Sequence, residues 1–276
     1  MLLFLIQKQK ALNNDTYLIR IMQLIFKKNI SKGTRFNQIY IPKQLENEFE
    51  VGDEVEVKLI KKRVQLNYSK KLKLSEFKED LIKNIFSFLS KSDRILNIFV
   101  VGSFLTEKID YNDIDIVIVT KEKINNFDEI IYNKLIDKFN LKFHVLTIEE
   151  QRFEQLLKIC PLTQSMFSLY ISSKKTSLER EKVIDKNHIK FLLMMPEDLL
   201  ELELGSKTFL DSVRRLITIE RFLENKDLEK INIESEKLLG KEIYITMKNN
   251  ERIDEKDIIK IREIIKDKLK KIKEMI

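Results

Sequence analysis

Two apolar runs separated by a short polar segment constrain the fold of this chain most strongly. Residues 95–101 and 113–120 are rich in Ile, Val and Phe, which favours buried β-strands. Gly102 and Ser103 end the first run, and Asp113 opens the second. Because glycine and serine are typical turn residues, the chain is predicted to leave a sheet at Gly102 and to re-enter it at Asp113.

The residue types around this turn suit the phosphates of a nucleotide. Gly102 allows the backbone to approach a ligand closely, and the Ser103 hydroxyl adds a hydrogen-bond donor. The free N–H groups of a helix that starts there would favour an anion. Asp113 and Asp115 are two residues apart in a strand, so their carboxylates are expected on one face, where they suit Mg²⁺ or Mn²⁺. The alternative is a plain β-turn-β unit whose acids are only solvated.

The order Gly-Ser, a spacer of residues 104–112 and Asp-x-Asp in a strand resembles the signature of the DNA-polymerase-β-like nucleotidyltransferase superfamily. The resemblance implies transfer of an NMP from an NTP, with ATP as the expected nucleotide, to a hydroxyl of a protein, an RNA or a small molecule. It implies that Gly102 and Ser103 bind the triphosphate. It also implies that Asp113 and Asp115 are catalytic residues and metal ligands.

The superfamily resemblance also implies a third carboxylate on the next strand, and this chain departs from that pattern. The expected strand, residues 141–147, holds no Asp or Glu, and His144 occupies the corresponding position. His144 could act as the general base, or Glu149 or Glu150 could reach back from the end of the strand. The site could also bind nucleotide and metal without fast turnover, or His144 could be an ordinary hydrogen-bonded strand residue.

Residues 22–70 are predicted to form a small β-rich module, with strands at 24–29, 38–41, 54–59 and 61–68 and a short helix at 43–49. Within it, Thr34–Lys43 and Val51–Val57 resemble the AbrB/MazE-type swapped-hairpin domain. That resemblance implies a homodimer and DNA contacts through basic side chains. The candidate DNA-binding residues are Lys27, Lys28, Lys32 and Arg35, and the alternative is a solvated basic face. Residues 1–21 are interpreted as an N-terminal extension, with Met22 as an alternative start.

The remaining chain is predicted to form a nucleotidyltransferase domain over residues 71–183 and a helical domain over 184–276, which gives an α+β fold with a mixed central sheet and a C-terminal helical bundle. An amphipathic helix at 71–92 should turn Phe77 inward, and the superfamily resemblance places the tail 173–176 at the rim of the site. Three basic residues spaced seven apart fall on one helical face. These residues, Lys207, Arg214 and Arg221, are candidates for phosphate or RNA contact, with a solvated face as the alternative.

Composition sets broad limits on the class of protein. The chain has 276 residues, a formal net charge of +7 and one cysteine, so an intrachain disulfide is impossible and a cytoplasmic setting is expected. No apolar run is long enough to cross a bilayer. A competing hypothesis is a DNA-binding regulator with a nucleotide-binding, catalytically impaired core. An aminoglycoside-type transferase ranks last, because the AbrB-like start is unexpected for such enzymes.

Overall fold

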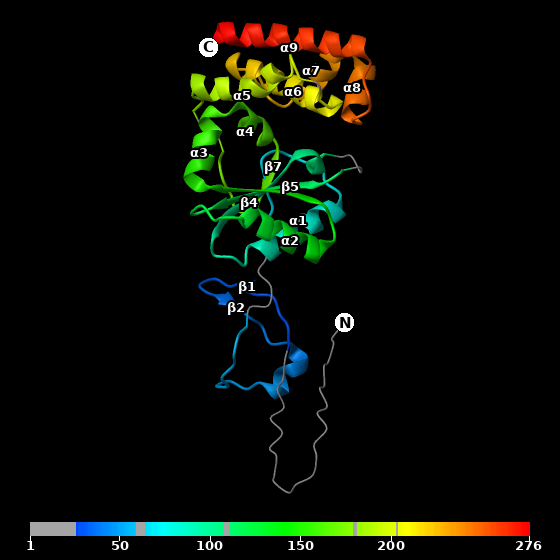
Figure 1. Ribbon diagram of the computed structural model, residues 1–276. Helices are drawn as coiled ribbons and strands as arrows, with labels where there is room; N and C mark the ends of the chain where they lie inside the picture. The colour runs from blue at the N-terminus through cyan, green and yellow to red at the C-terminus, as the bar shows by residue number, and fades with distance from the viewer. Residues whose placement is uncertain (1–25, 59–63, 107–110, 179–180, 203) are drawn as a thin grey trace. The chain divides into compact units, whose positions relative to one another are not determined.

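The computed structural model describes residues 26–58, 64–106, 111–178, 181–202 and 204–276. The chain divides into two compact units, residues 1–59 and residues 60–276, and each is described by itself. Figure 1 shows the elements of both units along the chain. The N-terminal extension of residues 1–21 lies outside the described residues.

The first unit contains a two-stranded antiparallel sheet and a short 3-10 helix. Strand β1 (Ser31–Lys32) pairs with β2 (Asn37–Gln38), and η1 spans Lys43–Glu48. The short helix is confirmed. The strands predicted at 24–29 and 54–59 are wrong where they can be judged, because residues 26–30 and 53–58 form no strand. A short strand needs neighbours and a covered face to be stable, and a single copy of this unit supplies few of either.

The second unit is built on a five-stranded mixed sheet in the order β3-β7-β4-β5-β6. The strands are β3 (Asn67–Tyr68), β4 (Ile95–Val101), β5 (Ile114–Thr120), β6 (Phe143–Glu149) and β7 (Tyr170–Ser172). All pairs are antiparallel except β5 with β6, so the predicted mixed sheet is confirmed. Residues 67–68, which the sequence assigned to the N-terminal module, belong to this sheet instead.

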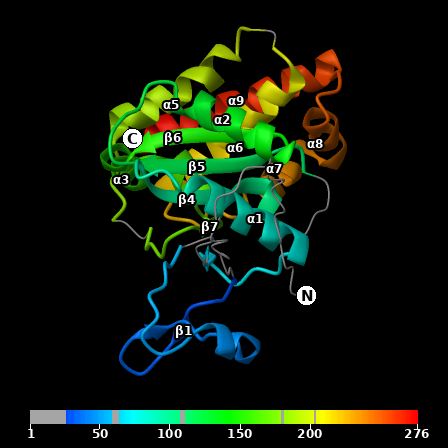
Figure 2. The same ribbon diagram turned by 90° about the horizontal axis from the view of Figure 1, so that it is seen from below.

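Helices cover both faces of the sheet. They are α1 (Glu76–Leu89), α2 (Phe127–Phe139), α3 (Glu150–Ile159), α4 (Pro161–Met166), α5 (Lys186–Asp198), α6 (Ser206–Leu223), α7 (Ile231–Leu239), α8 (Lys241–Lys248) and α9 (Glu255–Met275). Figures 1 and 2 show α1 and α2 on one face and α3 and α4 on the other, with α5–α9 stacked beyond α4. The C-terminal helical bundle is therefore confirmed. None of the helices in the described part of the chain is long and apolar enough to cross a membrane.

The alternation of side chains along β4 and β5 explains this layering. Ile98 and Val100 join the core beneath α1 and α2, whereas Phe99 and Val101 join the core beneath α3. Successive strand residues point to opposite faces, so runs without polar interruption require cover on both sides. The unbroken apolar stretches 98–101 and 116–119 thus match a sheet that is buried on both faces.

Two predictions about this unit are wrong. Phe77 of α1 is 63% exposed, whereas the neighbouring Lys78 is buried. The tail at 173–176 does not lie at the Gly102 turn, because β7 runs antiparallel to β4 with Tyr170 opposite Val101. The tail therefore continues towards the start of β4, where the Asn97 side chain hydrogen-bonds it.

Candidate active site

The antiparallel pairing of β4 and β5 brings the Gly102 turn against Asp115. Val101 lies opposite Asp115 in the register, and Gly102 follows directly with a φ of +77°. A Cβ atom on Gly102 would stand 2.2 Å from Oδ2 of Asp115. Only glycine leaves room for the carboxylate at this point and adopts this φ at no steric cost. The structure therefore brings together the glycine and one of the acids that the sequence singled out.

The turn after β4 forms the short 3-10 helix η2 (Gly102–Leu105) and presents Ser103 on the surface. The carbonyl of Ser103 accepts hydrogen bonds from the backbone N–H and the hydroxyl of Thr106, at 3.1 and 2.7 Å. These two hydrogen bonds satisfy the Ser103 carbonyl and stabilise the turn. The Ser103 side chain is left exposed at the same end of the sheet as Asp115.

The two acids lie at the start of β5. Asp113 precedes the strand by one residue, and Asp115 is its second residue. Burial raises the pKa of Asp115, and the negative charge of Asp113 raises it further, while a hydrogen bond with His144 acts in the opposite direction. The carboxylates therefore lie within electrostatic range of one another. A nearby divalent cation would relieve this repulsion, because an opposite charge favours the ionised form.

His144 lies next to Asp115 because β5 and β6 are parallel and place the two residues in register. The Nδ1 atom of His144 is 3.1 Å from Oδ1 of Asp115, and the His144 side chain is 73% exposed. His144 is thus an accessible imidazole held by one of the acids. Glu149 lies opposite Thr120, at the other end of β5, about 17 Å along the strand at 3.3–3.4 Å per residue. The alternative in which Glu149 or Glu150 replaces the third carboxylate is therefore wrong.

The donor set fits one kind of metal site. In the described part of the chain, no group of three or more His, Cys, Asp or Glu side chains could enclose an ion. Mg²⁺ is commonly held by one or two carboxylates together with phosphate oxygens and water. Asp113 and Asp115 fit an ion that arrives with a nucleotide, and they do not form a closed protein cage.

The three basic candidates of the C-terminal domain lie along α6. Lys207 is exposed, and Arg214 lies 3.6 Å from Asp211 on the same helix. Arg221 donates to Glu234 of α7 at 2.7 Å, and only 15% of its side chain is exposed. The structure thus uses Arg221 to join two helices of the bundle. A phosphate or RNA contact for these residues stays a prediction.

The four basic candidates for DNA contact lie in the first unit, and all are exposed: Lys27, Lys28, Lys32 and Arg35. Lys32 ends β1, and Arg35 lies in the loop that joins β1 to β2. Their exposure is compatible with either DNA contact or solvation, so the role of these residues stays a prediction.

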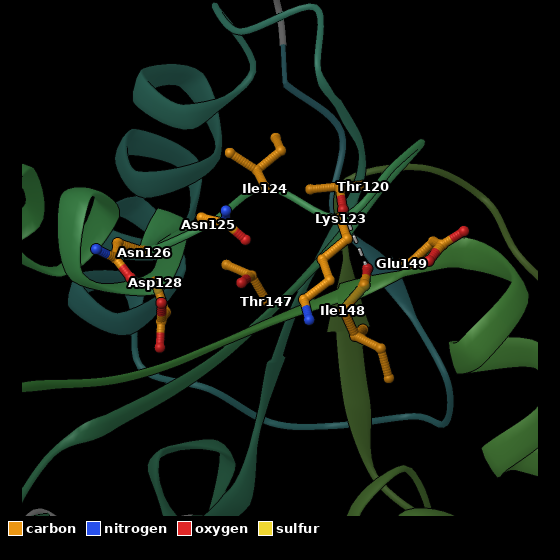
Figure 3. A pocket seen from close by; sticks show the side chains of 9 residues that line it. All are labelled: Thr120, Lys123, Ile124, Asn125, Asn126, Asp128, Thr147, Ile148 and Glu149. Atoms are coloured by element: carbon orange, nitrogen blue, oxygen red, sulfur yellow. Dashed lines mark hydrogen bonds between the residues drawn. The ribbon is translucent and has the colours of Figure 1, made fainter.

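A cavity of about 380 Å³ opens at the carboxyl ends of β5 and β6 (Figure 3). It is lined by Thr120, Lys123, Ile124, Asn125, Asn126, Asp128, Thr147, Ile148 and Glu149. Thr120 and Glu149 lie opposite each other at the ends of these strands, whereas Asp115 lies near the start of β5. The cavity is therefore distinct from the Gly102–Asp115 site.

Residues 79–191 match the family model described as Nucleotidyltransferase domain. The match includes β4, the Gly102 turn, both acids and His144. The match indicates a nucleotidyltransferase domain in this region and therefore a transferase enzyme. The matched region lies outside residues 22–70, so the AbrB/MazE-like module and its homodimer stay predictions.

A solved structure of spectinomycin adenyltransferase AAD(9) from Enterococcus faecialis, with ATP and spectinomycin, is similar to this chain. The sequence identity is 15% and the TM-score 0.40, and the similarity covers 70% of this chain and 100% of that one. No curated protein matches the sequence.

Proposed function

We propose that this protein is a Mg²⁺-dependent nucleotidyltransferase that moves an NMP from an NTP, with ATP as the expected donor, to an acceptor hydroxyl. The position of the Asp115 carboxylate is the main support for this proposal. The Oδ2 atom of Asp115 lies so close to Gly102 that it leaves no room for a Cβ atom there. The other oxygen, Oδ1, is 3.1 Å from Nδ1 of His144. A turn suited to phosphate, an acid suited to a metal and a proton acceptor thus lie together at one end of the sheet.

Each of these groups has a distinct part in the proposed reaction. The Gly102–Ser103 backbone and the Ser103 hydroxyl bind the triphosphate, since backbone N–H groups and hydroxyls donate hydrogen bonds to phosphate oxygens. Asp113 and Asp115 would hold Mg²⁺, which when bound neutralises charge on the phosphates. The acceptor hydroxyl attacks the α-phosphorus in line, the bond to the bridging oxygen breaks, and pyrophosphate leaves.

His144 takes the proton of the acceptor hydroxyl in this proposal. If Nδ1–H donates to Asp115, the ring is held in the tautomer whose Nε2 can accept a proton. A carboxylate that orients an imidazole and stabilises its charged form is a recurrent arrangement in general base catalysis. The missing third carboxylate is therefore replaced by a neutral base that adds no negative charge to the site.

Calorimetric titration of the protein with ATP in the presence and absence of Mg²⁺ tests the proposal. Asp113→Ala and Asp115→Ala should abolish the metal-dependent part of binding. Asp128→Ala, which removes an exposed acid at the other end of the sheet, serves as the control and should bind like wild type. Unchanged titrations in both Asp113→Ala and Asp115→Ala would exclude this site.

The acceptor can be sought with α-labelled ATP and cell extract. Label in a protein band, an RNA band or a small-molecule fraction identifies the acceptor class. No transfer, together with a gel shift of the protein's own promoter, would instead favour the DNA-binding regulator with an impaired core. The exposed basic side chains of the first unit are compatible with that alternative.

We also propose that the first unit mediates a homodimer. Leu45 is its only buried apolar residue among 26–58, whereas eight large apolar side chains are exposed: Ile30, Phe36, Ile39, Tyr40, Ile41, Val51, Val55 and Val57. A unit of this size hardly buries enough apolar surface to be stable by itself, and a second copy would cover these groups. Sedimentation velocity should give a dimer for the full chain, and a monomer at micromolar concentration would contradict it.

A further inference from the structure

Lys78 of α1 is the most unusual residue beside the site. It is only 6% exposed, although a lysine ammonium is costly to remove from water unless it has partners. Burial lowers the pKa of Lys78. Burial of the Lys78 ammonium therefore requires compensating interactions, and its partners provide them.

The ammonium of Lys78 hydrogen-bonds the chain that follows β4. Its Nζ donates to the carbonyl oxygen of Phe104 at 2.9 Å and to that of Thr106 at 2.8 Å. Phe104 lies within η2, two residues after Gly102, and Thr106 follows the end of η2. Because peptide planes are rigid, fixing two carbonyls in this short segment also restricts the neighbouring peptides of the turn.

The same ammonium also contacts the segment that leads to the acids. It lies 5.1 Å from the centroid of the Phe104 ring and 5.5 Å from that of Tyr111. The two rings pack edge to face with their centroids 4.8 Å apart. Tyr111 lies two residues before Asp113, so one side chain of α1 contacts the 104–112 spacer both next to the Gly102–Ser103 turn and next to the acids.

We propose that Lys78 is a positioning residue that holds the Gly102–Ser103 turn in a fixed relation to Asp113 and Asp115. The inference rests on the proposed function, because the turn and the acids are expected to bind the same nucleotide. The contacts described above join Lys78 to Phe104, Thr106 and Tyr111. An apolar residue would fill the space but would leave the two carbonyls without this donor.

Calorimetry with Mg²⁺ and ATP, combined with hydrogen–deuterium exchange, tests the role of Lys78. Lys78→Met retains most of the volume and removes the donors, so its ATP affinity should fall about tenfold, which is the effect of losing one hydrogen bond to a charged phosphate. Exchange should become faster in peptides covering 102–106 and stay unchanged in β6. Lys83→Met, on the same helix with 42% of the lysine side chain exposed, is the matched control and should behave like wild type.

Rescue separates positioning from a general loss of stability. Lys78→Arg can still donate to both carbonyls and should recover part of the affinity. If Lys78→Met does not fold, Lys78→Gln, which is shorter and carries no charge, replaces it and should bind ATP more weakly than wild type. Wild-type affinity and wild-type exchange at 102–106 in the folded variant would overturn the role of Lys78 alone. Absence of metal-dependent ATP binding in the wild-type protein would overturn both this role and the proposed function.

Discussion

Replacement of Gly102 by alanine should displace the Asp115 carboxylate and so weaken the binding of Mg²⁺-ATP. The size of this effect can be estimated from the structure. The new methyl carbon would stand 2.2 Å from Oδ2 of Asp115, well inside van der Waals contact. Because Gly102 has a φ of +77°, the substitution also strains the backbone. Two separate costs are therefore expected, one from the backbone and one from the carboxylate.

The two costs have different magnitudes and different consequences. A non-glycine residue in the left-handed region costs about 1–2 kcal/mol. Moving the Asp115 carboxylate off its rotamer costs about 0.5–1.5 kcal/mol, and the exposed hydrogen bond with His144 adds little. The free energy of unfolding should thus fall by about 2–3 kcal/mol. A displaced Asp115 should also lower Mg²⁺-ATP affinity at least about tenfold, since binding geometry is sensitive to shifts near 1 Å.

Gly240→Ala is the matched control for backbone strain. Gly240 also has a positive φ, +85°, but an added Cβ there would meet nothing within 4 Å. This variant should show only the backbone cost, and its ATP affinity should equal that of wild type. Urea denaturation measures both variants on the same scale.

A double-mutant cycle isolates the contact between Gly102 and Asp115. In an Asp115→Ala background the carboxylate is absent, so Gly102→Ala should cost no more than Gly240→Ala does. The expected coupling is about 1 kcal/mol, which is within the range that such cycles resolve for residues in contact. If Gly102→Ala costs the same with and without Asp115, and leaves ATP affinity intact, the carboxylate is not held against this glycine and the geometry argued above is wrong.

Three further predictions concern the base and the helical bundle. His144→Asn should leave Mg²⁺-ATP affinity within about threefold but slow transfer of labelled AMP by roughly 10²–10⁴-fold, the usual contribution of a general base. Glu220→Ala should lower the free energy of unfolding in urea by about 3 kcal/mol, because it leaves two lysines of α9 without their buried carboxylate. Hydrogen bonds, led by that of Lys226, lower the pKa of Glu224 to about 2, so its stabilising effect is full above pH 4.5 and is lost as the pH falls towards 2. Melting temperatures between pH 6 and 2 should show this loss, and Glu224→Gln should reduce it.

The sequence predicted the parts of the fold that depend on local pattern. The strands β4 and β5, the turn at Gly102 and the C-terminal helices all follow from periodicity and turn chemistry. The strands predicted at 24–29 and 54–59 failed where they can be judged, because residues 54–58, for example, alternate correctly but have no partner strand among the described residues. Alternation indicates that a strand is possible, whereas pairing decides whether it forms.

The rotation of α1 about its axis, which decides which side chains face the core, could not be predicted from the local sequence pattern. Residues 77 and 78 both flank the apolar stripe that continues through Leu81 and Ile85, and hydrophobicity alone favours Phe77. The structure buries Lys78 instead, because the turn after β4 offers it two carbonyls and two rings. A lysine one helical turn before Ile82, on the buried side, was the available signal, and its partners lie 26 to 33 positions later in the sequence.

The role of His144 depends on strand order, which the sequence does not state. A histidine in a half-exposed strand has no visible partner until the parallel pairing of β5 with β6 sets it beside Asp115. A carboxylate in its place would add a third negative charge near Asp113 and Asp115, and like charges in proximity would raise the pKa of Asp115 further. An imidazole avoids that repulsion and still accepts a proton, so the site needs less positive charge to keep Asp115 ionised. We therefore propose that the departure from the superfamily pattern is a change of base rather than the loss of one.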